Sequence, residues 1–181
     1  MISFSNKNKD ISKNEFMELV HNRTDILYRI ALTYVKDKDL ASDAVQDSIL
    51  NAYKNLSNLK EKEKFNSWVT TILVNRCKEI LRQNKKVSFF EFKEEVLSES
   101  KINNSYYDKA YTNVENKIDV INMLQYIDEK YREVISLKYL GDYTIEEISK
   151  ILNIPEGTVK SRLNFGIKKL KVLMEVKNNA L

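Results

Sequence analysis

Apolar residues recur at the three- and four-residue spacing of amphipathic helices through the first 86 positions of the chain. Ser12 and Glu15 have the S-x-x-E spacing of a capping box and predict a helix start. Positions 37–39 interrupt the pattern and can cap a second helix, and the polar stretch 57–64 precedes a third. The three apolar stripes contain Phe16, Leu19, Val20, Leu27, Ile30, Ala31 and Tyr34; Leu40, Ala44, Val45, Ile49, Ala52, Tyr53 and Leu56; and Trp68, Val69, Ile72, Leu73, Cys77, Ile80 and Leu81. We expect residues 12 to about 86 to form three helices, with room for one short extra helix.

The pattern changes between residues 87 and 113, where Ser and Asn cluster and acids outnumber bases. This composition is typical of a linker. The linker also contains the aromatic residues Phe89, Phe90, Phe92, Tyr106 and Tyr107. They allow two interpretations: docking on a partner, or sealing the linker onto the first domain.

Helical spacing returns at residue 114 and continues through Ile121 and Leu124. Asp128 can cap a further helix that Gly141 ends at its C′ position. Thr144 and Glu147 form a second capping box before a short helix, and residues 153–155 make a tight break before a last helix over about 156–176.

Turn residues are scarce, with 3 Gly and 1 Pro in 181 residues. A β-sandwich, a β-barrel or a Gly-rich phosphate loop cannot be built from this inventory. The sequence therefore predicts an all-α protein of two small helical domains, residues 1–86 and 114–181, joined by a flexible linker over 87–113. The C-terminal domain contains a helix-turn-helix.

The reactive residues are one cysteine, Cys77, and one histidine, His21. One of each cannot assemble a catalytic triad or a zinc site, so we expect no enzyme activity, no metal and no cofactor. Cys77 lies on an apolar face and is expected in the core, and His21 is expected to be an ordinary surface or packing residue. The absence of a disulfide pair, a signal peptide and a membrane-spanning run predicts a cytoplasmic protein with no direct membrane insertion.

Positive charge is concentrated locally although the formal net charge is only +4. Residues 157–171 contain five bases and no acid, whereas residues 115–156 contain nine acids and five bases. Residues 76–86 contain five bases and one acid. A basic helix is by itself a weak signal for nucleic acid.

The spacing around the last two helices strengthens that signal. Ser149 is small where two helices must approach, Asn153 suits a left-handed turn, and Val159 can pack the second helix back on the first. The apolar residues Ile148, Leu152, Ile154, Val159 and Leu163 would close the core, and the polar residues between them would face outward. A helix presented in this way fits the major groove of DNA.

Residues 145–163 closely resemble region 4 of bacterial sigma factors of the extracytoplasmic-function (ECF) group, above all the string GTVKSRL at 157–163. Residues 44–53 resemble region 2.2, and residues 65–69 with 75–82 resemble regions 2.3 and 2.4. The resemblance covers nearly the whole chain in the right order. Three positions depart from the usual pattern: Ser149 stands for Ala, Asn153 for Gly, and Glu79 for Asp. Ser149 and Asn153 keep the small size and the tolerance of a left-handed backbone that these positions need, so the fold is expected to be unchanged.

The resemblance implies a transcription initiation factor that directs core RNA polymerase to promoters with −10 and −35 elements. It implies that the β′ clamp helices bind Asp43, Gln46, Asp47 and Leu50, and that the polymerase β flap is a further contact. It implies −10 recognition and melting by Phe65, Trp68, Asn75, Lys78, Glu79 and Arg82, although the spacing of Trp68 favours the core. It implies −35 recognition by Thr158, Lys160, Ser161, Arg162, Asn164 and Lys168. It also implies an anti-sigma protein, often membrane-anchored, that holds the factor inactive until a stress signal arrives.

Two other functions fit parts of the chain. A stand-alone helix-turn-helix regulator would use residues 114–181 and leave residues 12–86 without a function. An enzyme with a DNA-binding appendage would need catalytic groups that one His and one Cys cannot supply.

Overall fold

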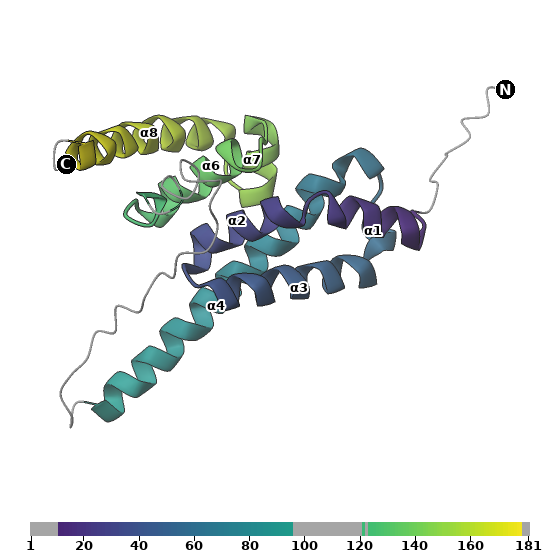
Figure 1. Cartoon of the computed structure of the whole chain (residues 1–181), viewed down its shortest axis with the longest axis horizontal. Helices are drawn as coiled ribbons and strands as arrows, with labels where there is room; N and C mark the ends of the chain where they lie inside the picture. The colour runs from purple at the N-terminus through teal and green to yellow at the C-terminus, as the bar shows by residue number, and fades with distance from the viewer. Residues whose placement is uncertain (1–10, 96–120, 122, 179–181) are drawn as a thin grey trace.

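The structure is a computed structural model and describes residues 11–95, 121 and 123–178 of the chain (Figure 1). In chain order its helices are α1 (Lys13–His21), α2 (Thr24–Val35), α3 (Lys38–Lys54), α4 (Phe65–Glu95), α6 (Glu129–Tyr139), α7 (Ile145–Leu152) and α8 (Glu156–Asn178), with the short 3-10 helices η1 (Leu56–Asn58) and η2 (Lys62–Lys64) between α3 and α4. No strand occurs in the described ranges, and the all-α class is confirmed.

The capping box predicted at the start of the chain is present. The Glu15 amide donates to the Ser12 hydroxyl at 3.2 Å, and the Ser12 amide donates to the Glu15 carboxylate at 3.0 Å. The hydrogen bond from the Ser12 amide, followed by the bond from the Lys62 ammonium, lowers the pKa of Glu15 to about 2. Because Lys62 lies in η2, this carboxylate also ties the first helix to the turn before α4.

The first apolar stripe forms two helices, and the nine-residue α1 is the short extra helix for which the prediction of three left room. The chain turns at Asn22 and Arg23 between α1 and α2. The Thr24 hydroxyl donates to the Val20 carbonyl at 2.8 Å and satisfies one of the acceptors that the break leaves free. The spacing of apolar residues continues across the turn, which is why the pattern alone does not reveal it.

The helix α3 starts where the sequence indicated. Lys36 adopts a left-handed conformation (φ 59°), and the Asp37 carboxylate then accepts a hydrogen bond from the Leu40 amide at 2.8 Å. Tyr53, which the pattern assigned to the core, is instead 47% exposed near the end of this helix. The Tyr53 ring still contacts the Phe16 ring, and the two ring centroids are 5.3 Å apart.

The helix α4 continues to Glu95, beyond the domain end predicted at residue 86. The backbone of residues 87–95, the first part of the predicted linker, is therefore helical. The rest of the predicted linker, residues 96–113, lies outside the described residues, and so do Tyr106 and Tyr107. The side chains of Phe89, Phe90 and Phe92 lie outside the description as well.

The second unit consists of α6, α7 and α8 and contains the predicted helix-turn-helix. Gly141 follows the C-cap of α6 as predicted, but the left-handed residue of this turn is Asp142 (φ 57°). The glycine is needed for space, because a Cβ at this position would lie 2.5 Å from the Tyr143 ring and 2.8 Å from the Leu137 carbonyl oxygen. Glycine is therefore needed at position 141 because the Tyr143 ring lies so close to the chain, and not because the backbone there requires a positive φ.

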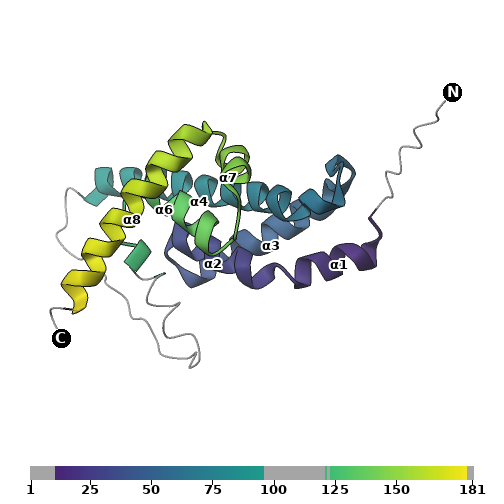
Figure 2. The same cartoon turned by 90° about the horizontal axis from the view of Figure 1, so that it is seen from above.

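The two units pack against each other, with α4 against α7 and α2 against α6. Figure 1 shows the second unit lying over α2 and α4, and Figure 2 shows α8 crossing above α4. Buried apolar residues form one continuous cluster through both units, including Leu27, Ile30, Leu73, Leu124 and Ile148. The contact between the units therefore contains a hydrophobic core and not only a polar rim. We call this contact the seam.

Candidate nucleic-acid interface

The four residues predicted to bind polymerase share one face of α3. Asp43, Gln46, Asp47 and Leu50 stand at the helical positions i, i+3, i+4 and i+7, and all four are exposed. Leu50 is 58% exposed, and Tyr53 extends the same face one turn further. An exposed apolar patch flanked by acidic groups is typical of a protein-binding surface. The exposed face of Tyr53 was missed because its position also fits the core stripe.

Arg76 connects this face to α4 and was absent from the predicted sites. Its guanidinium lies 2.7 Å from the Asp47 carboxylate and 3.0 Å from the Glu79 carboxylate. The arrangement joins a residue predicted to bind polymerase and a residue predicted to bind DNA through one shared cation. The signal available in the sequence was the basic segment that begins at Arg76.

The predicted −10 residues of α4 lie on one side of the helix. Asn75 and Arg82 are exposed, whereas Lys78 and Glu79 are partly covered. The Lys78 ammonium pairs at 2.9 Å with Glu133 of α6, whose side chain is only 8% exposed. This ion pair crosses the seam, so the second unit occupies part of the predicted −10 surface.

The two aromatic residues at the start of α4 differ in exposure. Phe65 is 1% exposed and makes an edge-to-face contact with Phe16 at 5.8 Å, so its ring is a core residue and is not presented to a base. The prediction for Phe65 is corrected on this point. Trp68 packs against the core but stays partly exposed, 6.3 Å from the Phe65 ring. Spacing alone cannot separate these two positions because both fit an apolar stripe.

The helix-turn-helix has the geometry that its sequence predicted. Thr144 accepts from the Glu147 amide at 3.2 Å and its own amide donates to the Glu147 carboxylate at 2.8 Å, which completes the capping box. Asn153 is left-handed with φ 52°. The Ser149 hydroxyl donates to the Ile154 carbonyl at 2.6 Å, so this side chain is more than a small spacer. Ile148 and Val159 are fully buried between α7 and α8.

The predicted −35 residues lie along the N-terminal half of α8, and their exposure separates them into two groups. Lys160, Ser161, Asn164 and Lys168 are exposed, whereas Thr158 and Arg162 are partly buried. Lys160 makes only a long ion pair with Glu156 at 3.8 Å. The next base along, Lys169, instead pairs with Asp128 at 2.5 Å and holds α8 against the start of α6. The Lys160 and Lys168 side chains are therefore exposed on the outward face of α8, where phosphate groups of DNA could contact them.

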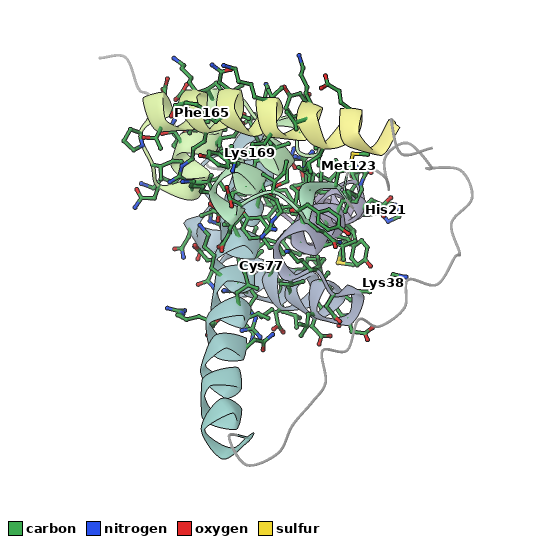
Figure 3. The ribbon with its side chains drawn as sticks, turned by 90° about the vertical axis from the view of Figure 1, so that its left-hand side faces the viewer. His21, Lys38, Cys77, Met123, Phe165 and Lys169 are labelled. Atoms are coloured by element: carbon green, nitrogen blue, oxygen red, sulfur yellow. The ribbon has the colours of Figure 1, made fainter. Side chains whose placement is uncertain are left out.

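Phe165 belongs to this surface and was missed by the sequence analysis. It is 58% exposed between Asn164 and the lysines that follow, and Figure 3 shows it on α8. An exposed phenylalanine on a basic helix can contact a thymine methyl group in the major groove. The available signal was an apolar residue outside the apolar stripe of its helix.

No group of three or more His, Cys, Asp or Glu side chains that could hold a metal occurs among the described residues. His21 is exposed at the end of α1, and Cys77 is fully buried amid the packed helices (Figure 3). Burial raises the pKa of the Cys77 thiol to about 12, which makes it a poor nucleophile. Within the described ranges, none of the helices combines the length and the apolar character that crossing a membrane requires.

Comparison with known protein families gives two matches. Residues 19–87 match the model described as Sigma-70 region 2, and residues 117–170 match Sigma-70, region 4. The first match contains the predicted polymerase and −10 residues, and the second contains the predicted −35 residues.

Three relatives from Bacillus subtilis (strain 168) extend the similarity to most of the chain. The RNA polymerase sigma factor SigV is 29% identical over 167 residues, which is 92% of this chain and 95% of SigV. The ECF RNA polymerase sigma factor SigW is 27% identical over 172 residues, which is 90% of this chain and 92% of SigW. The RNA polymerase sigma factor SigZ is 30% identical over 78% of this chain and 76% of SigZ.

Two solved structures share the fold. The sigma factor RpoE, in complex with the anti-sigma factor NepR from Bartonella quintana, gives a TM-score of 0.68 at 22% identity. The match covers 90% of this chain and 98% of the RpoE chain. CnrH, in complex with the cytosolic domain of CnrY, gives a TM-score of 0.64 at 17% identity, and the match covers 91% of this chain and 90% of the CnrH chain. With the two family matches and the full-length relatives, these results show that the chain belongs to the sigma-70 family of RNA polymerase sigma factors, in its ECF group.

Proposed function

We propose that this protein binds core RNA polymerase through α3 and directs it to promoters through α4 and α8. One observation carries the proposal: a single chain of this family presents an exposed acidic and apolar face on α3 and a basic helix-turn-helix helix on a separate surface. The polymerase performs the chemistry, and the sigma factor supplies recognition. The first unit, residues 1–86 with the continuation of α4, would serve as region 2, and residues 114–181 would serve as region 4.

In region 2, Asn75, Lys78, Glu79 and Arg82 would contact the −10 element. Trp68 is the aromatic residue available to stack on an unpaired base, since its ring is partly exposed. Opening the duplex costs a few kcal/mol for each unstacked base, and stacking on an aromatic ring recovers roughly 1–3 kcal/mol. Phe65 would support Trp68 from the core side.

In region 4, the outward face of α8 would bind the −35 element. Lys160, Ser161, Asn164 and Lys168 are exposed there, with Thr158 and Arg162 at its edge. A bidentate contact from an arginine to a guanine is worth about 1–3 kcal/mol of discrimination against another base. The N-terminal turn of α8 adds backbone N–H groups suited to a phosphate.

We infer that an anti-sigma factor regulates the protein by covering these surfaces. The support is the similarity in fold to RpoE, which was solved with the anti-sigma factor NepR, and to CnrH, which was solved with the cytosolic domain of CnrY. A membrane-anchored partner would couple release of this factor to stress at the cell surface.

The direct test is promoter-specific transcription by core polymerase that lacks any other sigma factor. Adding this protein is expected to produce discrete transcripts from promoters upstream of its regulon. Absence of such transcripts, together with DNA binding by the protein alone, would favour a stand-alone helix-turn-helix regulator.

Two sets of variants separate the surfaces. Arg162→Ala is expected to lower transcript yield about 10-fold, the effect of roughly 1.4 kcal/mol, while binding to core polymerase stays unchanged. Asp43→Ala is expected to weaken core binding and leave DNA contacts intact, and it avoids the Asp47 ion pair with Arg76. Lys13→Ala, exposed on α1, is the matched control. Loss of core binding in Arg162→Ala would show that the surfaces are misassigned.

A further inference from the structure

Phe165 of α8 is an apolar residue that the function proposed above leaves without a role. Its side chain is 58% exposed, whereas the apolar stripe of the same helix, which includes Val159 and Leu163, is buried. Burial of an aromatic ring is favourable, and the fold does not use this ring for its core. The ring is therefore available to a partner of the protein.

Contacts between α8 and α6 fix the rotation of α8, so Phe165 cannot turn inward. Gly166 is buried against α6, where a Cβ would lie 2.7 Å from the Ile135 side chain. One turn after Phe165, the Lys169 ammonium pairs with Asp128 at 2.5 Å (Figure 3). These two contacts hold the adjoining side of the helix against α6. The phenyl ring is thus presented outward in a defined orientation.

The neighbours of Phe165 on the helix surface are all polar, and three of them are cationic. Ser161 and Arg162 stand at i−4 and i−3, and Lys168 and Lys169 stand at i+3 and i+4. An aromatic residue that binds another protein usually belongs to a larger apolar patch, which these four positions do not provide. A basic surface around one ring instead suits a polyanion that also carries an apolar group.

Duplex DNA presents one such apolar group in its major groove, the C5-methyl group of thymine. The other base edges there present hydrogen-bond donors and acceptors, which a phenyl ring would separate from water without offering a bond in return. The ring therefore gains free energy over a thymine methyl group and loses it over the polar edge of another base. A phenylalanine that faces the groove discriminates between bases by this difference.

The residues around Phe165 restrict the contact to a short segment of DNA. Ser161 and Lys168 flank it and are both exposed. At 1.5 Å per residue they lie about 10 Å apart along the helix axis, which equals about three base pairs at 3.4 Å each. Phe165 would therefore meet one base pair, while the cations around it contact phosphates without regard to sequence.

We propose that Phe165 reads one thymine of the −35 element by covering its C5-methyl group. The proposal rests on the function proposed above and makes Phe165 a specificity-determining residue of that interface. The contribution of one buried methyl group corresponds to about a fourfold difference in affinity.

The test uses the complex of core polymerase with the full-length protein and a DNA library randomised over the −35 segment. Selection with the unmodified protein is expected to recover one position that prefers thymine, and Phe165→Ala is expected to lose the preference at that position alone. Uracil then replaces each selected thymine, because it lacks only the methyl group and keeps the same hydrogen-bonding edge. At one position it is expected to weaken binding of the unmodified protein about fourfold and to leave binding of Phe165→Ala unchanged.

Val172→Ala is the matched control. Val172 is 57% exposed and lies two turns further along α8, so it tests the loss of an exposed apolar side chain from the same helix. This variant is expected to select the same sequence as the unmodified protein and to show the same sensitivity to uracil. Far-ultraviolet circular dichroism is expected to be equal for all three proteins.

Binding of the unmodified protein that is insensitive to uracil at every selected thymine would overturn the proposal, and this measurement needs no variant. An equal effect of uracil on the unmodified protein and on Phe165→Ala would also overturn it, because another group would then contact the methyl. If Phe165→Ala weakened binding equally on thymine and uracil DNA, the ring would contact protein and the proposal would be wrong. Selection of no sequence at all by the complex would instead overturn the proposed function itself.

Discussion

Gly141 offers a direct test of how the seam is built, because it stands where the chain leaves α6 and Tyr143 folds back. An alanine there would place its Cβ 2.5 Å from the Tyr143 ring and 2.8 Å from the Leu137 carbonyl oxygen. Carbon atoms prefer about 3.5–4.0 Å, so the ring must move by roughly 1 Å. Neither obstacle is the end of a flexible side chain, and the strain cannot be relieved by a rotamer change alone.

The expected cost follows from two effects that add and one that opposes them. Overpacking costs about 1–3 kcal/mol, and each weakened bond of the Tyr143 hydroxyl costs about 1 kcal/mol. Replacing glycine restricts the unfolded chain and returns about 0.4–1 kcal/mol. The net loss for Gly141→Ala is therefore about 2–4 kcal/mol. For a chain of this size it corresponds to a fall in Tm of about 4–16 °C.

The assay is thermal unfolding followed by circular dichroism, with Gly157→Ala as the matched control. A Cβ at Gly157, in the first turn of α8, would meet nothing within 4 Å. Its replacement is expected to be neutral or to stabilise by up to about 1 kcal/mol. If Gly141→Ala melted at the temperature of the unmodified protein, the close contact with Tyr143 would not be important for stability.

Two further predictions concern the capping boxes. Thr144→Ala is expected to lower the free energy of unfolding by about 1 kcal/mol in urea titrations, whereas Thr144→Ser keeps the hydroxyl and most of the stability; equal losses in both would argue against the cap. The pKa of Glu15 is lowered from 4.5 to about 2 in the folded protein, so its contribution is complete above pH 4.5 and is lost as the pH falls towards 2. Glu15→Gln is expected to flatten this part of the acid-unfolding curve, and the exposed Glu63→Gln is not; identical curves for Glu15→Gln and the unmodified protein would refute the assignment.

Local signals in the sequence were sufficient for most of the helix starts. Ser12, Asp37 and Thr144 each accept a side-chain hydrogen bond from the amide three residues further on, so the pattern of neighbouring residues determines the cap. The left-handed Asn153 was predicted because asparagine tolerates this backbone conformation. The turn between α1 and α2 was not predicted because Arg23 provides no side-chain cap there.

The parts that the sequence did not predict depend on contacts between distant segments. Tyr143 meets Asn66 and Thr70 across more than 70 positions, and no periodicity encodes such a pair. The burial of Phe65 and the exposure of Tyr53 depend likewise on whether a neighbouring helix covers an apolar stripe. The outward position of most polar residues on α8 was predictable, since the apolar and polar faces of one helix follow its own spacing.

The seam has a consequence for exchanging parts between related proteins. Regions 2 and 4 each have their own helices, and chimeras that combine them would be expected to keep promoter preferences from each parent. Thr70, Asn66 and Arg23 from one region nevertheless match Tyr143 and Gly141 from the other. A chimera whose two halves lack these matching residues would therefore be expected to fold each region and to lose the packing between them. The packing between the units is therefore a property of the pair of regions and of neither alone.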